Sequence, residues 1–138
     1  MKKNILLFAA MLCMGIASAQ KKAPYNVVFD VTSADTVVHQ MVMRWIGEIT
    51  QADPTARVEV VFYAKSLGMV TKDQSVVGGQ IKKFAANKNV AFRVCEVAMK
   101  NNNVERQQLL DGVGTVPDGI YEIISKQYEG WGYIKAAR

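Results

Sequence analysis

The stretch Tyr25-Asn-Val-Val-Phe-Asp-Val31 decides the fold, because a helical pattern follows directly behind this short apolar block. A compact run of β-branched and aromatic residues is typical of a buried strand. Apolar side chains then recur at helical spacing from Val38 to Ile49, which predicts an amphipathic helix. Ser33 or Asp35 is placed to cap its first turn. The block and the helix are the first pair of an alternating series.

The remainder of the chain continues this alternation. We expect strands over 57–64, 90–95 and 131–134, and helices over 77–86, 104–110 and 119–128, with 111–114 as a loop. Strands alternating with helices in this way predict an α/β sandwich whose sheet is mainly parallel. The sheet should have four to five short strands and helices on both faces.

The first twenty residues have the pattern of a signal peptide. Lys2 and Lys3 precede an apolar segment from Ile5 to Ile16, and Ala17-Ser-Ala19 is an A-x-A cleavage site. We therefore expect residues 1–20 to be removed, Cys13 with them, and the protein to be periplasmic or secreted. A lipidated Cys13 is disfavoured, because bulky Leu12 precedes it.

Residues 21–138 have the length of one domain with one core. Loss of two lysines with the leader lowers the formal charge from +5 to +3, and the other lysines are scattered. Nucleic-acid binding requires a concentrated basic face, so we do not expect it. No second apolar stretch is long enough to cross a membrane, and we expect no membrane association after cleavage.

Cys95 is the only cysteine that the cleaved chain keeps, so it has no partner for an intramolecular disulfide. It ends a predicted strand, and ligands collect at the carboxyl ends of parallel strands. We expect Ser33, Glu96 and Lys100 as its site neighbours: Lys100 would favour the thiolate, whereas Glu96 would oppose it. The alternative is a buried cysteine that acts as a small apolar side chain.

The other candidate groups favour structural roles. His39, the only histidine, is expected as a partly exposed helix residue just off the apolar stripe. One histidine and one cysteine fall short of a closed zinc site, so we expect no metal, and no cofactor motif is present. Gly112, Gly114 and Gly119 match neither G-x-G-x-x-G nor a P-loop, and are interpreted as turns and a helix start.

An ordered set of segments resembles the DsrE/DsrF-like family. The segments are Asn26-Val-Val-Phe-Asp-Val-Thr-Ser33, Val58-Glu-Val-Val-Phe-Tyr63, Phe92-Arg-Val-Cys95, Leu110-Asp-Gly-Val113, Val116-Pro-Asp-Gly119 and Lys126-Gln-Tyr-Glu-Gly-Trp-Gly-Tyr-Ile134. The closing run is the most specific of these. The resemblance covers essentially the whole of residues 21–138.

This resemblance implies a flavodoxin-like three-layer sandwich that assembles as a homo-oligomer, typically a trimer or hexamer. In sulfur-relay members a cysteine carries a persulfide and passes it to a thiol of a donor or acceptor protein, and Cys95 matches that cysteine. A sulfur carrier or sulfurtransferase is thus the leading hypothesis. The alternatives are a binding or assembly module with a silent Cys95, and a redox-sensing thiol that pairs between subunits. The predicted export, and the Lys- and Asn-rich loop after Cys95, depart from the relay pattern.

Overall fold

The computed structural model describes residues 23–138, so the predicted leader and Cys13 lie outside the described part. The elements in chain order are β1 (Asn26–Val31), α2 (Thr36–Ala52), β2 (Arg57–Phe62), the 3₁₀ turn η2 (Ser66–Met69), α3 (Gly78–Ala85), β3 (Val90–Cys95), α4 (Glu96–Asn101), the 3₁₀ turn η3 (Arg106–Gln108), β4 (Val113–Val116), α5 (Gly119–Tyr128) and β5 (Gly132–Ala136). Between residues 23 and 138 no helix is both long and apolar enough to span a bilayer.

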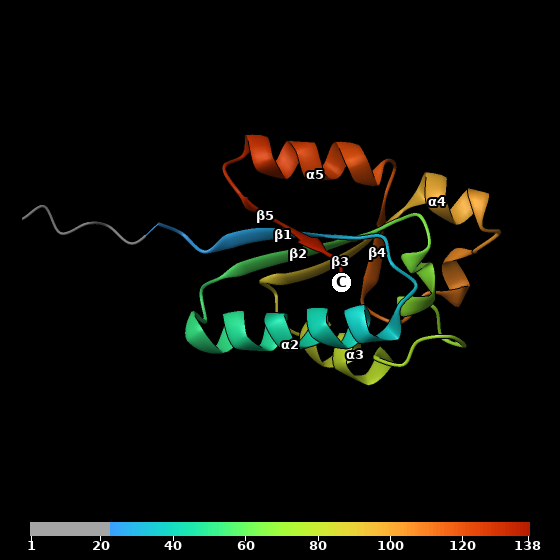
Figure 1. Ribbon diagram of the computed structural model, residues 1–138, viewed down its shortest axis with the longest axis horizontal. Coiled ribbons are helices and arrows are strands. Elements are labelled where there is room, and N and C mark those ends of the chain that lie inside the picture. Colours follow the sequence, from blue (N-terminus) through green and yellow to red (C-terminus); the bar gives the residue numbers. More distant parts are fainter. Residues whose placement is uncertain (1–22) are drawn as a thin grey trace, which may run out of the picture.

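The five strands form one parallel sheet in the order β4-β3-β2-β1-β5. Helices α2 and α3 cover one face, and α5 covers the other (Figure 1). The predicted α/β sandwich is confirmed. Because every strand runs the same way, the residues that follow β1, β2, β3 and β4 emerge on the same side of the sheet, where the carboxyl ends of the strands lie. We call this side the carboxyl edge.

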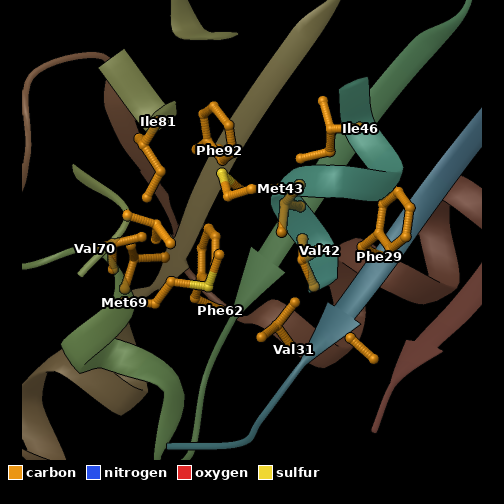
Figure 2. Packing of buried hydrophobic residues seen from close by; sticks show 14 of the residues in the cluster. Phe29, Val31, Val42, Met43, Ile46, Phe62, Met69, Val70, Ile81 and Phe92 are labelled. Atoms are coloured by element: carbon orange, nitrogen blue, oxygen red, sulfur yellow. The ribbon is translucent and has the colours of Figure 1, made fainter. Parts of the chain in front are cut away.

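The main core lies between the sheet and the α2/α3 layer, where aromatic side chains from the strands meet aliphatic side chains from the helices (Figure 2). Phe62 and Phe92 stack across β2 and β3 with ring centroids 6.3 Å apart. Each fully buried side chain of this size contributes about 1.5–3 kcal/mol. Beneath α5 the buried cluster is smaller, consisting of Val28, Val61 and Ile123.

The two long helices begin at aspartate caps. The Asp35 carboxylate accepts a hydrogen bond from the backbone N–H of Val37, so Asp35, and not Ser33, caps α2. Asp118 caps α5, whose bounds agree with the predicted helix 119–128. In α5, Ile123 is buried against the sheet, whereas Ile120 and Ile124 are 57% and 55% exposed.

Two local predictions between β3 and α5 were wrong. Residues 111–114 were expected to form a loop, but Val113–Val116 form edge strand β4, which pairs with β3 from Phe92↔Val113 to Cys95↔Val116. The four residues Val113–Val116 include Gly114 and have no apolar block that would predict a strand. Their extended conformation follows from pairing with β3. The helix expected over 104–110 is only η3, and the real helix, α4, starts directly after Cys95.

Candidate functional site

Cys95 ends β3 and is also the N-cap residue of α4. Its free thiol belongs to a residue that is only 6% exposed. It nevertheless lines a pocket of about 230 Å³ at the carboxyl edge of the sheet. The apolar residues of this Cys95 pocket are Ala64, Val97, Ala98 and Ile120. Its other lining residues are Tyr63, Asn101, Asn102 and Asp118.

The first turn of α5 packs directly on Cys95. A Cβ placed on Gly119 would lie 3.0 Å from the Cβ of Cys95, 3.7 Å from its Sγ and 3.1 Å from Val61 Cγ1. Contacts this short leave no space for a side chain, so glycine is required here by close approach. The sulfur therefore lies under the N-terminal end of a ten-residue helix. A helix N-terminus by itself favours negative charge, but the Asp118 carboxylate already occupies this one, and burial opposes a charge at this position as well.

Tyr63 connects the Cys95 pocket to a buried polar network around Asp30. Asp30 is 5% exposed, and its carboxylate accepts hydrogen bonds from the Tyr133 hydroxyl (2.7 Å) and the Lys135 ammonium (2.9 Å). Burial, followed by a hydrogen bond to Asp30, raises the pKa of Tyr63 to about 12. A hydrogen bond to Asp30, followed by burial, raises the pKa of Tyr133 to about 12. Both phenols stay protonated at neutral pH.

The three expected neighbours of Cys95 lie outside its pocket. Glu96 accepts hydrogen bonds from Thr115 and Arg106, and together with Lys100 it lines a different surface pocket. Ser33 accepts a hydrogen bond from the backbone N–H of Asp35, 3.1 Å away, at the start of α2.

His39 was expected to be partly exposed, and that expectation was wrong. It is 4% exposed, with Nε2 2.8 Å from the carbonyl oxygen of Ser33. This backbone acceptor satisfies the ring and lets it be buried at the start of α2. Among the described residues, no three His, Cys, Asp or Glu side chains gather closely enough to hold a metal ion.

Sequence reasoning missed Tyr63, Asp118 and Gly119. Each of them follows the carboxyl end of β2 or β4, and parallel pairing brings those ends beside Cys95. They lie one to three residues beyond the observed strands, but the sequence placed Tyr63 inside the expected strand 57–64 and predicted no strand before Asp118 and Gly119.

The sequence profile of the DsrE/DsrF-like family matches residues 9–136, and the chain belongs to this family. The match begins within the segment that has the signal-peptide pattern. No curated protein matches the chain.

Solved structures share the fold. MTH1491 from Methanobacterium thermoautotrophicum, a protein of unknown function, superimposes with a TM-score of 0.75 at 26% identity, over 80% of this chain and 98% of its own. YchN from E. coli gives a TM-score of 0.68 at 10% identity, over 81% and 98%. BT1422 from Bacteroides thetaiotaomicron, a conserved protein of unknown function, gives 0.66 at 13% identity, over 80% and 94%. The last two likenesses show the fold alone.

Proposed function

We propose that this chain is an exported, homo-oligomeric sulfur-handling protein that carries sulfane sulfur as a persulfide on Cys95. The observation that supports it most directly is the free thiol at the carboxyl end of β3, lining a pocket at the edge where α/β proteins bind their ligands. Membership of the DsrE/DsrF-like family supports the same reading. The signal-peptide pattern of residues 1–20 supports export to the periplasm or beyond the cell.

The chemistry is an exchange at sulfur. The Cys95 thiolate attacks the terminal sulfur of a donor persulfide, R–S–S–H, so that a bond from Sγ to that sulfur forms and the donor's S–S bond breaks. The donor leaves as a thiolate and takes up the proton that Cys95 released. Attack by an acceptor protein's thiol on the terminal sulfur then returns Cys95 to its thiol form. Neither step needs an external oxidant or reductant, because the sulfane sulfur only changes partners.

Self-association is part of this proposal. Tyr121, Ile124 and Tyr128 recur at helical spacing on the outer face of α5 and are 70%, 55% and 94% exposed. A stripe of large apolar side chains in water is typical of an interaction surface. A second copy of the chain is the partner we propose for it, in a trimer or hexamer. Light scattering on a sizing column measures the mass of the assembly in solution, and Ile124→Lys should lower that mass towards the mass of a single chain.

Intact mass tests the sulfur chemistry. Cleaved protein incubated with an organic hydropersulfide should gain about 32 Da, the mass of one sulfur atom, and Cys95→Ser should gain nothing. Cyanide, which removes sulfane sulfur as thiocyanate, should reverse the gain. An equal gain in Cys95→Ser would refute the proposal.

A binding or assembly module is the second candidate, favoured by the 6% exposure of Cys95 and by another pocket. That pocket has about 370 Å³ and lies between α2 and the β1/β5 edge, with Trp45, Ile49 and Ile134 in its wall. For such a module, alkylation of Cys95 would be slow in the native protein and fast after unfolding. Sulfur loading of native Cys95 within minutes would exclude a silent thiol.

A further inference from the structure

The Cys95 pocket has an unusual balance of charge. Among the described residues that line the pocket, Asp118 is the only one with a carboxylate side chain. The other polar lining groups are the amides of Asn101 and Asn102 and the phenol of Tyr63, which a pKa of about 12 keeps neutral. Within residues 23–138, no lysine or arginine lines the pocket.

One anion-binding feature at the pocket, the N-terminus of the ten-residue helix α5, is already occupied by the chain itself. A helix N-terminus carries about half a positive charge and free N–H groups that bind anions. At α5, however, the Asp118 carboxylate accepts hydrogen bonds from the backbone N–H groups of Ile120 and Tyr121, with N···O distances of 2.8 and 3.1 Å. A full negative charge outweighs that half charge, so this end of the pocket is left net negative.

The cations around the site are engaged elsewhere. Lys135 binds Asp30 and Thr32, each at 2.9 Å. The Arg93 guanidinium lies against Gly114 on β4 and interacts with Glu59. Lys100 lines the neighbouring pocket with Glu96 and Arg106. An anionic substrate therefore meets no lysine or arginine among the described lining residues, and the N–H groups of Ile120 and Tyr121 at the start of α5 are already bound by Asp118.

We propose that the Cys95 pocket selects its substrate by charge, accepting uncharged or cationic sulfane-sulfur compounds and disfavouring anionic ones such as thiosulfate, with Asp118 as the specificity-determining residue. The substrate class follows from the lining: a short organic hydropersulfide whose apolar stem contacts Val97 and Ile120. This inference rests on the proposed sulfur-carrying role of Cys95, but the charge selectivity itself is measurable without that role.

Two donors of equal sulfur chemistry and opposite charge test it. 2-Aminoethyl hydropersulfide carries an ammonium group, and 2-carboxyethyl hydropersulfide carries a carboxylate. The rate of sulfur gain on Cys95, read by intact mass, should be about fivefold higher with the ammonium donor, as expected for one charge near another in water. The ratio should fall towards one at high salt. Thiosulfate, a dianion, should be slower than either.

Asp118→Asn is the informative variant, because asparagine caps helices as well as aspartate and so preserves α5. In it the donor preference should shrink to about twofold or less. Asp111→Asn is the matched control, since Asp111 is exposed and precedes β4, at the opposite edge of the sheet. It makes the same change in net charge and should keep the fivefold preference.

Alkylation gives a readout independent of sulfur transfer. Iodoacetamide and iodoacetate share their chemistry and differ by one negative charge. Normalised to a small free thiol, Cys95 should react about threefold more slowly with iodoacetate, and Asp118→Asn should remove that difference. The charge selectivity would be refuted, and the proposed sulfur-carrying role left standing, by equal rates with both reagents and both donors in the wild type. An unchanged preference of Asp118→Asn for the ammonium donor would have the same meaning. Charge-selective alkylation without sulfur gain from any donor would overturn the proposed function and leave the selectivity standing.

Discussion

Glu59 on β2 and Lys126 on α5 form an ion pair between the sheet and the helix, with Glu59 Oε2 3.8 Å from Lys126 Nζ and the two side chains 7% and 18% exposed. The same ammonium lies 3.5 Å from Glu122 and 3.7 Å from Glu129, so three carboxylates share one lysine. Burial, followed by a hydrogen bond with Glu122, raises the pKa of Glu59 to about 7 despite the opposing effects of Lys126 and Arg93. One carboxyl group under α5 thus holds a proton close to neutrality.

This arrangement makes stability fall as pH rises. The folded state binds the Glu59 proton more tightly than the unfolded state does, whose pKa is near 4.5, so stability is lost between pH 4.5 and about 7. We expect a loss of at most about 3 kcal/mol from this group. Glu59→Gln, which stays neutral, should be more stable than the wild type at pH 8 by about 1–3 kcal/mol and nearly equal to it at acid pH.

Urea unfolding at several pH values checks the Glu59 prediction. Glu48→Gln is a suitable control, because its side chain is 63% exposed and forms only a surface pair with Arg44. That variant should follow the wild-type pH profile. A wild-type curve that runs parallel to that of Glu59→Gln from pH 4.5 to 8 would show that Glu59 does not titrate there.

The two phenols around Asp30 should titrate late. Their raised pKa values mean that the folded protein resists tyrosine ionisation, and that its stability falls as pH rises from about 10 towards about 12. Tyrosinate absorbance should show a transition near pH 12 that is reduced by one residue in Tyr63→Phe and in Tyr133→Phe. Circular dichroism over the same range identifies the pH at which unfolding begins. An alkaline limb of equal size in all three proteins would contradict the prediction.

Asp118 should contribute to stability as a helix cap as well as to selectivity. Asp118→Ala leaves the N–H groups of Ile120 and Tyr121 without their carboxylate partner, and should cost about 1 kcal/mol in urea unfolding. Asp118→Asn should cost only a few tenths of a kcal/mol, and Asp111→Ala should stay within about 0.5 kcal/mol of wild type. Equal losses in both Asp118 variants would mean that the charge, and not the cap, stabilises α5.

The sequence was sufficient wherever local patterns carry the structure. The apolar block of β1, the stripe on α2, the bounds of α5 and the position of Cys95 at the end of β3 all follow from spacing and composition. It was insufficient where pairing at a distance decides. β4 exists because β3 offers it an edge, and His39 is buried because a backbone carbonyl satisfies it.

The pocket was harder still to predict, because it depends on contacts between separate segments. Tyr63 and Asp118 are 32 and 23 residues from Cys95, and only the parallel sheet brings them to one edge. The expected neighbours Glu96 and Lys100 were chosen by closeness in sequence. In a helix that starts at Cys95, such residues turn away towards another surface.

Gly119 gives the sharpest test of the packing at Cys95. Gly119→Ala would place a methyl group 3.0 Å from Cys95 Cβ and 3.1 Å from Val61 Cγ1, so α5 must shift by a few tenths of an ångström. Overpacking of this kind costs about 1–3 kcal/mol, which exceeds the gain of up to about 1 kcal/mol from replacing a helical glycine by alanine. We expect net destabilisation by about 1 kcal/mol, and slower alkylation of Cys95 because the methyl group covers Sγ.

Gly79→Ala is the matched control for this substitution. Gly79 lies in the first turn of α3 with no atom within 4 Å of an added Cβ, so the same change there should stabilise the protein by a few tenths of a kcal/mol or more and leave the Cys95 alkylation rate unchanged. Opposite signs at the two glycines would establish that α5 is seated tightly on the thiol. Stabilisation at both would mean that the first turn of α5 moves freely away from Cys95, in which case the pocket is open to larger substrates than its volume of about 230 Å³ admits.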